Sequence, residues 1–74
     1  MKTDYKKSET SNMDKAYQWI VDAMKGESSV FFRYVSIIGS ETIYTDWMIP
    51  ENAKKEIASR NEYNTLKVER RIYK

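Results

Sequence analysis

The residue types that most often do chemistry are scarce in this chain. Its 74 residues include no Cys and no His, which excludes a thiolate nucleophile, an imidazole base and zinc sites built from these ligands. The acidic pairs Asp14 with Asp22 and Glu51 with Glu56 lack the three- or four-residue spacing that places two carboxylates on one helix face. The chain has only two glycines and no glycine-rich phosphate loop. We therefore expect no catalytic activity, no metal site and no cofactor.

Basic residues are concentrated near the C-terminal end. Residues 54–74 carry seven Lys or Arg against three Glu, whereas residues 1–53 carry six basic and eight acidic residues. Clustered positive charge suits phosphate groups or an acidic protein surface, although an ordinary solvated helix and edge strand explain it equally well. The candidate contacts to an anion or a nucleic acid are Lys67, Arg70, Arg71 and Lys74. The net charge of the whole chain is only +2, which argues against a strongly basic nucleic-acid-binding protein.

The elements that must position these residues fit into one small domain. Residues 1–10 are polar and predict a flexible tail, and residues 11–74 form the expected domain. A domain of this size buries a limited core, and without cysteines it has no disulfide. Partner binding or homodimer formation is thus an expected source of extra stability. The N-terminal residues lack the apolar core of a signal peptide, so we expect a cytoplasmic protein that does not enter a membrane.

A first helix is predicted from about residue 12 to residue 25. Ser11 opens a segment that resembles a capping box, with Asp14 in place of the usual Glu, and Gly26 ends the helical pattern. The apolar residues at helical spacing are Met13, Ala16, Tyr17, Ile20 and Met24. Trp19 lies outside this stripe and is expected to flank the core.

A second helix is predicted from about residue 50 to residue 61. Pro50 suits the first turn of a helix, and Ala53 and Ile57 form a thin apolar stripe. An alternative is a helix that starts earlier, with Asp46 as its N-cap, which would shorten the preceding strand.

Residues 28–50, "SSVFFRYVSIIGSETIYTDWMIP", predict two strands joined by a tight turn at Gly39 and Ser40. A loop of these two residues sets Ile38 opposite Glu41 and fixes every further pair along the hairpin. One predicted face carries Val30, Phe32, Tyr34, Ile38, Ile43, Trp47 and Ile49. The other carries Phe31, Val35, Ile37, Tyr44 and Met48, with the opposed ion pair of Arg33 and Asp46 in its middle.

Residues 64–74, "NTLKVERRIYK", alternate as a half-buried strand does, with Leu66, Val68 and Ile72 on one face. Arg70 interrupts the apolar side and is expected near the end of the sheet or near an interface. The predicted fold is an α+β domain of order α-β-β-α-β, with a three-stranded antiparallel sheet of order 2-1-3 and two helices on one face. In this arrangement the strand that begins at residue 28 is central.

If both helices cover the face with Phe32 and Trp47, the other face is left open. The candidate partner-binding residues on that open face are Phe31, Arg33, Val35, Tyr44, Asp46 and Met48. Exposed apolar patches with aromatic, Met and Arg side chains are typical of interfaces. Coverage by residues 1–10, or one helix on each face, is the structural alternative.

The functional prediction is a small non-catalytic binding protein, a regulator or inhibitor that docks on a partner protein through the open sheet face or a strand edge. The alternative is a nucleic-acid-binding protein that uses sheet aromatics and the basic C-terminal strand. The composition, rich in Lys, Ile, Tyr and Asn, is similar in general character to that of accessory proteins of bacteriophages and mobile elements, many of which bind host proteins.

Overall fold

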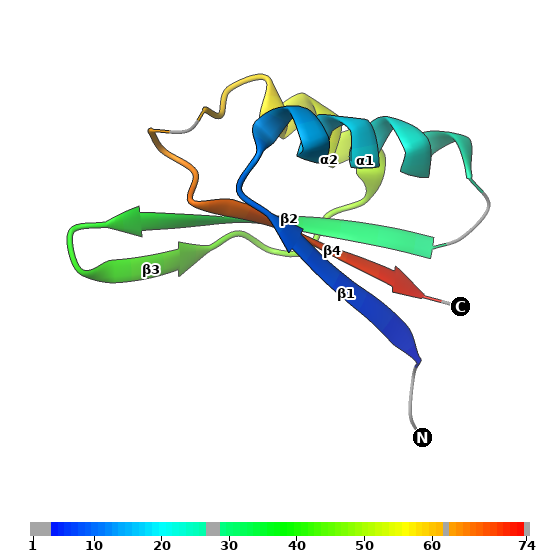
Figure 1. The fold of residues 1–74 in the computed structure, drawn as a ribbon, viewed down its shortest axis with the longest axis horizontal. Helices are drawn as coiled ribbons and strands as arrows, with labels where there is room; N and C mark the ends of the chain where they lie inside the picture. The colour runs from blue at the N-terminus through cyan, green and yellow to red at the C-terminus, as the bar shows by residue number, and fades with distance from the viewer. Residues whose placement is uncertain (1–3, 27–28, 62, 74) are drawn as a thin grey trace.

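Two helices lie on one side of an antiparallel sheet (Figure 1). The computed structural model describes residues 4–26, 29–61 and 63–73. Within these residues the elements are β1 (Tyr5–Thr10), α1 (Met13–Lys25), β2 (Ser29–Ile38), β3 (Glu41–Tyr44), α2 (Pro50–Ile57) and β4 (Lys67–Tyr73). The described part of the sheet has four strands in the order β1-β4-β2-β3.

The predicted flexible tail is instead the edge strand β1. It pairs antiparallel with β4 from Tyr5 opposite Tyr73 to Thr10 opposite Val68. The prediction of a three-stranded sheet is therefore wrong. Low hydrophobicity misled it, because a polar, lysine-containing strand is also what protects a sheet edge from unwanted pairing.

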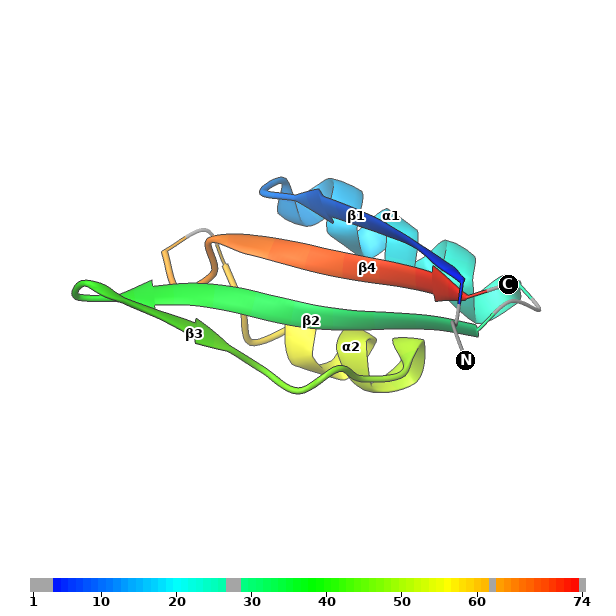
Figure 2. The same cartoon turned by 90° about the horizontal axis from the view of Figure 1, so that it is seen from below.

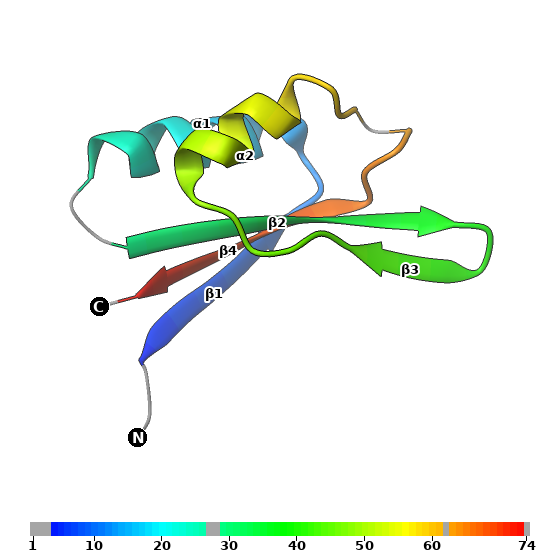
Figure 3. The same cartoon turned by 180° about the vertical axis from the view of Figure 1, so that it is seen from behind.

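The remaining strand order is confirmed. β2 is central, with β3 on one side and β4 on the other, and both pairings are antiparallel. β2 and β4 are in register from Ser29 opposite Tyr73 to Val35 opposite Lys67. Figure 3 shows from behind that α1 and α2 lie on the same side of this sheet, as predicted.

The N-cap of helix α1 lies one residue later than predicted, and the helix begins at Met13. Asn12, and not Ser11, is the N-cap, since the Asn12 side chain accepts a hydrogen bond from the Lys15 amide at 3.0 Å. The helix ends at Lys25 with Gly26 as its C-cap, as expected. Its buried residues are Ala16 and Ile20.

The apolar stripe of α1 differs at its borders from the prediction. Trp19 packs against the core, as predicted, and Ala23 does so as well. Tyr17 and Met24 are exposed. The buried stripe is rotated around the helix axis relative to the predicted one. The reason is that α1 contacts both the sheet and α2, so its buried residues are those that face the space between them.

Helix α2 begins at Pro50, as expected, and ends at Ile57. Ile49 is its N-cap, so the alternative start at Asp46 is wrong. Ala53 is buried and Ile57 packs against the core, as the thin apolar stripe predicted. Only 8 residues long, α2 covers less of the sheet than the predicted helix would.

The core lies between the helices and the sheet. Its buried members are Ala16, Ile20, Val30, Phe32, Tyr34, Ala53 and Val68. Tyr34 is the largest of the fully buried side chains, and its hydroxyl donates a hydrogen bond to the Ala53 carbonyl at 2.6 Å. Burial raises the pKa of this hydroxyl, and the Glu56 carboxylate raises it further, so Tyr34 remains a protonated donor.

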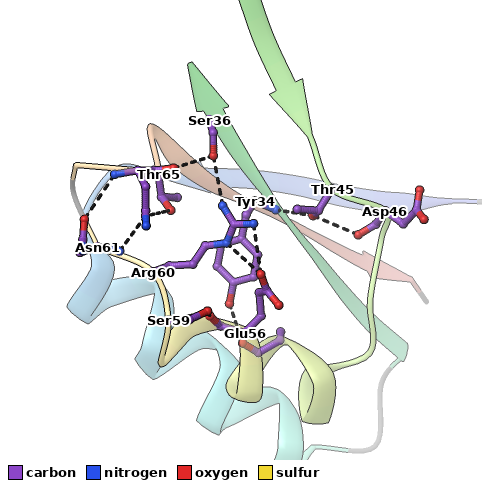
Figure 4. Close-up of polar contacts among 11 residues, drawn as sticks. Tyr34, Ser36, Thr45, Asp46, Glu56, Ser59, Arg60, Asn61 and Thr65 are labelled. Carbon is purple, nitrogen blue, oxygen red and sulfur yellow. Dashed lines mark hydrogen bonds and ion pairs between the residues drawn. The ribbon is translucent and has the colours of Figure 1, made fainter. Parts of the chain in front are cut away.

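A polar network holds the segment after α2 on the sheet (Figure 4). The Arg60 guanidinium lies 4.9 Å above the Tyr34 ring and donates to Ser36 Oγ and Glu56 Oε1, at 3.1 Å each. Ser36 Oγ donates in turn to the Asn64 carbonyl at 2.6 Å. The chain that leads into β4 is thereby fixed to β2 by side chains as well as by the backbone.

The β2–β3 hairpin follows the predicted register only near its turn. Gly39 has a φ of 64°, which a first-position glycine adopts at no steric cost. The four pairs from Ile38 opposite Glu41 to Val35 opposite Tyr44 are as predicted. Further along, however, Phe32 pairs with Met48 and not with Trp47.

A β-bulge explains this change of register. The Thr45 amide donates to the Tyr34 carbonyl at 3.0 Å, and Phe32 and Met48 exchange two backbone hydrogen bonds of 2.8 and 2.9 Å. Asp46 and Trp47 therefore stand together opposite the single residue Arg33. The predicted faces of Trp47 and Met48 are consequently wrong: the two side chains are exchanged.

The bulge has a local cause in the sequence. Thr45 Oγ1 accepts the Tyr34 amide hydrogen at 2.9 Å, which occupies a donor that a regular ladder would pair with a carbonyl of the opposite strand. Thr and Asp side chains compete with backbone partners in this way. The Thr45-Asp46 pair is thus the feature that indicates where the regular strand ends.

Candidate binding face of the sheet

One face of the sheet is not covered by the helices. Figure 2 views the molecule from below, with the four strands in front of the helices. We define the open face by the side chains that point away from the helices: Tyr5, Lys7, Glu9, Ser29, Phe31, Arg33, Val35, Ile37, Thr42, Tyr44, Trp47, Lys67, Glu69, Arg71 and Tyr73. The face therefore combines aromatic rings with charged groups and is not simply apolar.

Arg33 lies at the centre of the open face and is fixed there by three neighbours. Its guanidinium is 4.4 Å from the centre of the Tyr44 ring and 4.7 Å from that of Trp47. Its Nε donates to Glu69 Oε1 at 2.6 Å. Cation–π stacking and a charge-assisted hydrogen bond together restrict the orientation of this side chain.

Arg71 is the second stacked arginine on the open face. Its guanidinium lies 4.2 Å from the Trp47 ring centre and 4.8 Å from that of Tyr5. Its Nε is buried and has no hydrogen-bond partner among the described residues. Trp47 thus lies between Arg33 and Arg71 and orients both.

A shallow hollow of about 490 Å³ lies beside Arg71. Its lining residues are Ser29, Phe31, Trp47, Arg71 and Tyr73. Phe31 and Tyr73 meet edge to face at 5.7 Å, and Tyr73 also lies 5.3 Å from Tyr5. The hollow offers aromatic surface next to one guanidinium, a combination that suits an apolar group carrying a negative charge.

Glu69 is the buried acid of the open face, with 3% of its surface exposed. Besides Arg33, it has Lys7 Nζ at 3.8 Å and Lys67 Nζ at 3.7 Å. Because three cations surround it, its negative charge is compensated within the face.

The second acid of the open face, Glu9, pairs with Lys67 at 2.9 Å. The Lys67 ammonium lowers the pKa of Glu9, and the Glu9 carboxylate raises that of Lys67. Four cations and two acids therefore share the face: Lys7, Arg33, Lys67 and Arg71 against Glu9 and Glu69. Arg33 pairs closely with Glu69 and Lys67 with Glu9, so the excess positive charge belongs to Arg71 and Lys7.

The structure brings together part of the predicted partner-binding set. Phe31, Arg33 and Tyr44 lie on the open face. Val35 is also on this side but is 0% exposed between its cross-strand neighbours Tyr44 and Lys67, so a partner has no direct access to it.

The other two predicted members do not belong to the open face. Met48 pairs with Phe32 and packs against the core on the helix side, because the bulge moves it there. Asp46 is exposed in the bulge, and the predicted ion pair with Arg33 is wrong, since Arg33 pairs with Glu69.

The predicted basic group is divided between the two faces. Lys67 and Arg71 lie on the open face, whereas Arg70 lies on the helix side with its guanidinium 4.0 Å from the Trp19 ring centre. Burial lowers the pKa of Arg70, although the nearby Asp22 carboxylate opposes the shift. Lys74 lies outside the described residues. Strand alternation explains the division, because neighbours in a strand point to opposite faces.

Sequence reasoning missed several residues of the open face, namely Tyr5, Lys7, Glu9, Trp47, Glu69 and Tyr73. The β1 members carry no hydrophobic alternation that could have marked them, because Tyr5 is the only large apolar residue of that strand. Glu69 could not be paired with Arg33 without the register between β2 and β4, which is set by contacts far apart in the chain.

The parts of the chain that the structure describes contain neither a group of metal ligands nor a helix that could span a membrane. Within residues 4–26, 29–61 and 63–73, no group of three or more Asp, Glu, His or Cys side chains is placed to hold a metal ion. Neither helix of these same segments has the length and hydrophobicity needed to cross a membrane. The open face remains as the main candidate site.

Comparison of the chain with models of protein families, with curated proteins and with solved structures finds no match.

Proposed function

We propose that this chain is a non-catalytic binding protein, a regulator or inhibitor, whose open face docks on an acidic surface of a partner protein. The observation that carries the proposal is the pair of stacked arginines. Arg33 and Arg71 flank Trp47 at 4.7 and 4.2 Å and are held in place before any partner arrives. Preorganised side chains lose less freedom on binding, which favours affinity.

The two guanidinium groups retain donors for a partner. Apart from the bond from Arg33 Nε to Glu69, neither arginine donates a hydrogen bond to any other residue that the structure describes. A guanidinium presents its donors in a planar fork that matches a carboxylate. Aromatic and Arg side chains are also the types enriched at the centres of protein interfaces.

A protein partner is favoured over nucleic acid by the way the rings are used. Guanidinium groups lie over the rings of Tyr44, Trp47 and Tyr5, so these ring faces are less available for stacking with bases.

Single-stranded nucleic acid is the second candidate, and one observation favours it. The hollow formed by Phe31, Trp47, Tyr73 and Arg71 has the volume and the chemistry to take a base beside a phosphate contact. The test must therefore separate the two classes of partner.

The test uses two fluorescein-labelled probes: a peptide rich in Glu with interspersed Leu and Tyr, and a poly-dT oligonucleotide. Anisotropy is measured at about 50 and 200 mM salt, over which charge contacts weaken visibly. We expect the peptide to bind, to bind less tightly at the higher salt, and to shift the amide NMR signals of the open-face strands. Binding of poly-dT alone would favour the second candidate, and binding of neither probe would contradict both.

The matched variants are Arg71→Gln and Arg70→Gln. They remove the same charge from adjacent residues of β4 that lie on opposite faces. We expect Arg71→Gln to weaken peptide binding about tenfold, as the loss of one charge-assisted contact does, and Arg70→Gln to leave it unchanged. Equal effects of the two substitutions would mean that overall charge, and not the open face, is responsible.

A further inference from the structure

The outer edge of β3 differs from the outer edge of β1. The sheet order leaves both strands with one unpaired side in the described chain. β1 contains Lys6 and Lys7, which is a common protection against edge-to-edge pairing, whereas β3 has the sequence Glu-Thr-Ile-Tyr and no Lys or Pro. The β3 edge is therefore the unprotected one.

The backbone groups available on this edge can be identified from the hairpin. In a two-residue turn, the flanking residues Ile38 and Glu41 form a hydrogen-bonded pair, and bonded pairs then alternate along the ladder. The bond from the Thr45 amide to the Tyr34 carbonyl agrees with this phase. The amide and carbonyl groups of Thr42 and Tyr44 consequently point away from β2.

Apolar side chains are exposed beside the same edge. Ile38 is 66% exposed and Ile43 is 43% exposed, because the hairpin extends past the helices (Figure 1). Both line a groove of about 420 Å³, which Arg60 and its partners Ser36 and Glu56 also line. Figure 4 shows the contacts among these three polar residues. An uncovered isoleucine pair next to an unpaired strand edge is uncommon on a monomer.

We infer that a second copy of this chain pairs with β3, edge to edge and antiparallel. In a symmetric register centred on Ile43, Thr42 of one copy is opposite Tyr44 of the other, and this pair occurs twice. All the outward backbone groups of Thr42 and Tyr44 then find partners, in four hydrogen bonds between the copies. The register also sets Ile43 against Ile43 of the second copy.

Charge favours a second copy as the occupant. Glu41 is the only charged residue of β3, and in this register it faces Thr45 of the second copy, so no like charges meet. The edge is thus complementary to itself in hydrogen bonds, in apolar contact and in charge.

The dimer joins the two sheets into one. A two-fold axis perpendicular to the sheet places both open faces on the same side of the combined sheet. The inference rests on β3 and not on the proposed function, but it would give an acidic partner two adjacent sets of stacked arginines and a gain in avidity.

Sedimentation velocity of the intact chain, from micromolar to millimolar concentration, tests the inference. We expect a reversible monomer–dimer equilibrium. Thr42→Pro removes an amide hydrogen that β2 does not use, so it should raise the dimer dissociation constant about 30-fold through the loss of two interchain hydrogen bonds. Thr42→Val keeps the amide and is the matched control that should still dimerise.

A second variant keeps the test independent of proline. Ile43→Lys places two ammonium groups against each other at the axis and should abolish the dimer, while Ile43 is exposed enough for the monomer to fold. A wild-type chain that stays monomeric at all concentrations would overturn the inference. A dimer that survives both Thr42→Pro and Ile43→Lys would also overturn it, because it must use another surface.

Discussion

At the scale of single residues, Glu69 organises the open face. It receives Arg33 at 2.6 Å and lies within 4 Å of the ammonium groups of Lys7 and Lys67. These three cations come from three different strands, so one carboxylate links β1, β2 and β4. The stacked arginine at the centre of the face depends on this residue for its position.

Replacing Glu69 with Gln tests this role. The change keeps the shape of the side chain but removes the charge, and we expect the free energy of unfolding to fall by about 1.5–3 kcal/mol, the usual contribution of a hydrogen bond to a charged group. Chemical denaturation followed by circular dichroism measures the change. The control is Glu9→Gln, which lies directly opposite on β1 and is exposed. An equal loss of unfolding free energy in both variants would mean that the burial of Glu69 does not increase its contribution to stability.

Prediction from the sequence succeeded for single residues whose face of the sheet follows from strand alternation alone. The faces of Phe31, Arg33 and Tyr44 follow from the hairpin and are confirmed. The predicted partner of Arg33 was wrong. The assumed hairpin register placed Asp46 opposite Arg33, whereas the partner in the structure is Glu69 of β4. A pairing between residues 36 positions apart requires the register of two strands that the local sequence does not set.

At the scale of elements, the β1 strand shows why a polar segment is hard to assign. Its residues alternate between the open face and the helix side, but none is fully buried, so the hydrophobic signal is absent. Its stability comes from the ladder with β4 and from side-chain pairs such as Lys67 with Glu9. Helices α1 and α2 and the three other strands were predicted because each has an apolar side.

Removing residues 1–10 tests whether β1 is part of the folded unit. Loss of its ladder with β4 exposes the neighbouring backbone, and we expect the free energy of unfolding to fall by at least about 2 kcal/mol after the regained chain entropy is taken into account. Urea denaturation of the two chains gives the comparison. An unchanged midpoint would show that the segment contributes nothing, as a flexible tail would.

The pair of Glu9 and Lys67 makes the attachment of β1 dependent on pH. Lys67 lowers the pKa of Glu9 from its usual 4.5, so this contribution is present above pH 4.5 and is lost as the pH falls through the lowered pKa. Glu9 raises the pKa of Lys67 from its usual 10.5, so the contribution is complete below pH 10.5 and is lost as the pH rises through the raised pKa.

The corresponding prediction compares the wild-type chain with Lys67→Met across the pH range. The difference between their urea midpoints should be largest between pH 4.5 and 10.5 and should shrink on either side. Lys67→Arg retains the charge and serves as the control. A difference that does not vary with pH would assign the effect to packing of the lysine stem.

At the scale of the whole molecule, the helices and the sheet are unequal in extent. α1 and α2 cover one face, while the hairpin end of β2 and β3 extends beyond them (Figure 3). The sequence predicted the one-sided arrangement correctly. It did not predict the overhang, because that depends on α2 ending at Ile57 and not near residue 61.

A chain that uses this overhang to form a dimer should melt in a concentration-dependent way. Mass action stabilises an associated state as the protein concentration rises, so we expect the midpoint of thermal unfolding to increase between micromolar and millimolar chain. The Ile43→Lys variant, which should not dimerise, should show a midpoint that does not depend on concentration. Calorimetry at several concentrations makes the comparison, and a constant midpoint for the wild type would argue against association.

The bulge at Asp46 also bears on how this gene tolerates the loss of a codon. In most strands the deletion of one residue reverses the face of every side chain that follows it. Here, removing Asp46 would pair Arg33 with Trp47 and leave Phe32 opposite Met48, so each remaining side chain would keep its present face. Asp46 is thus a spare position. A lineage could lose it and keep the core and the stacked arginines, with a straighter and longer β3 as the only visible change.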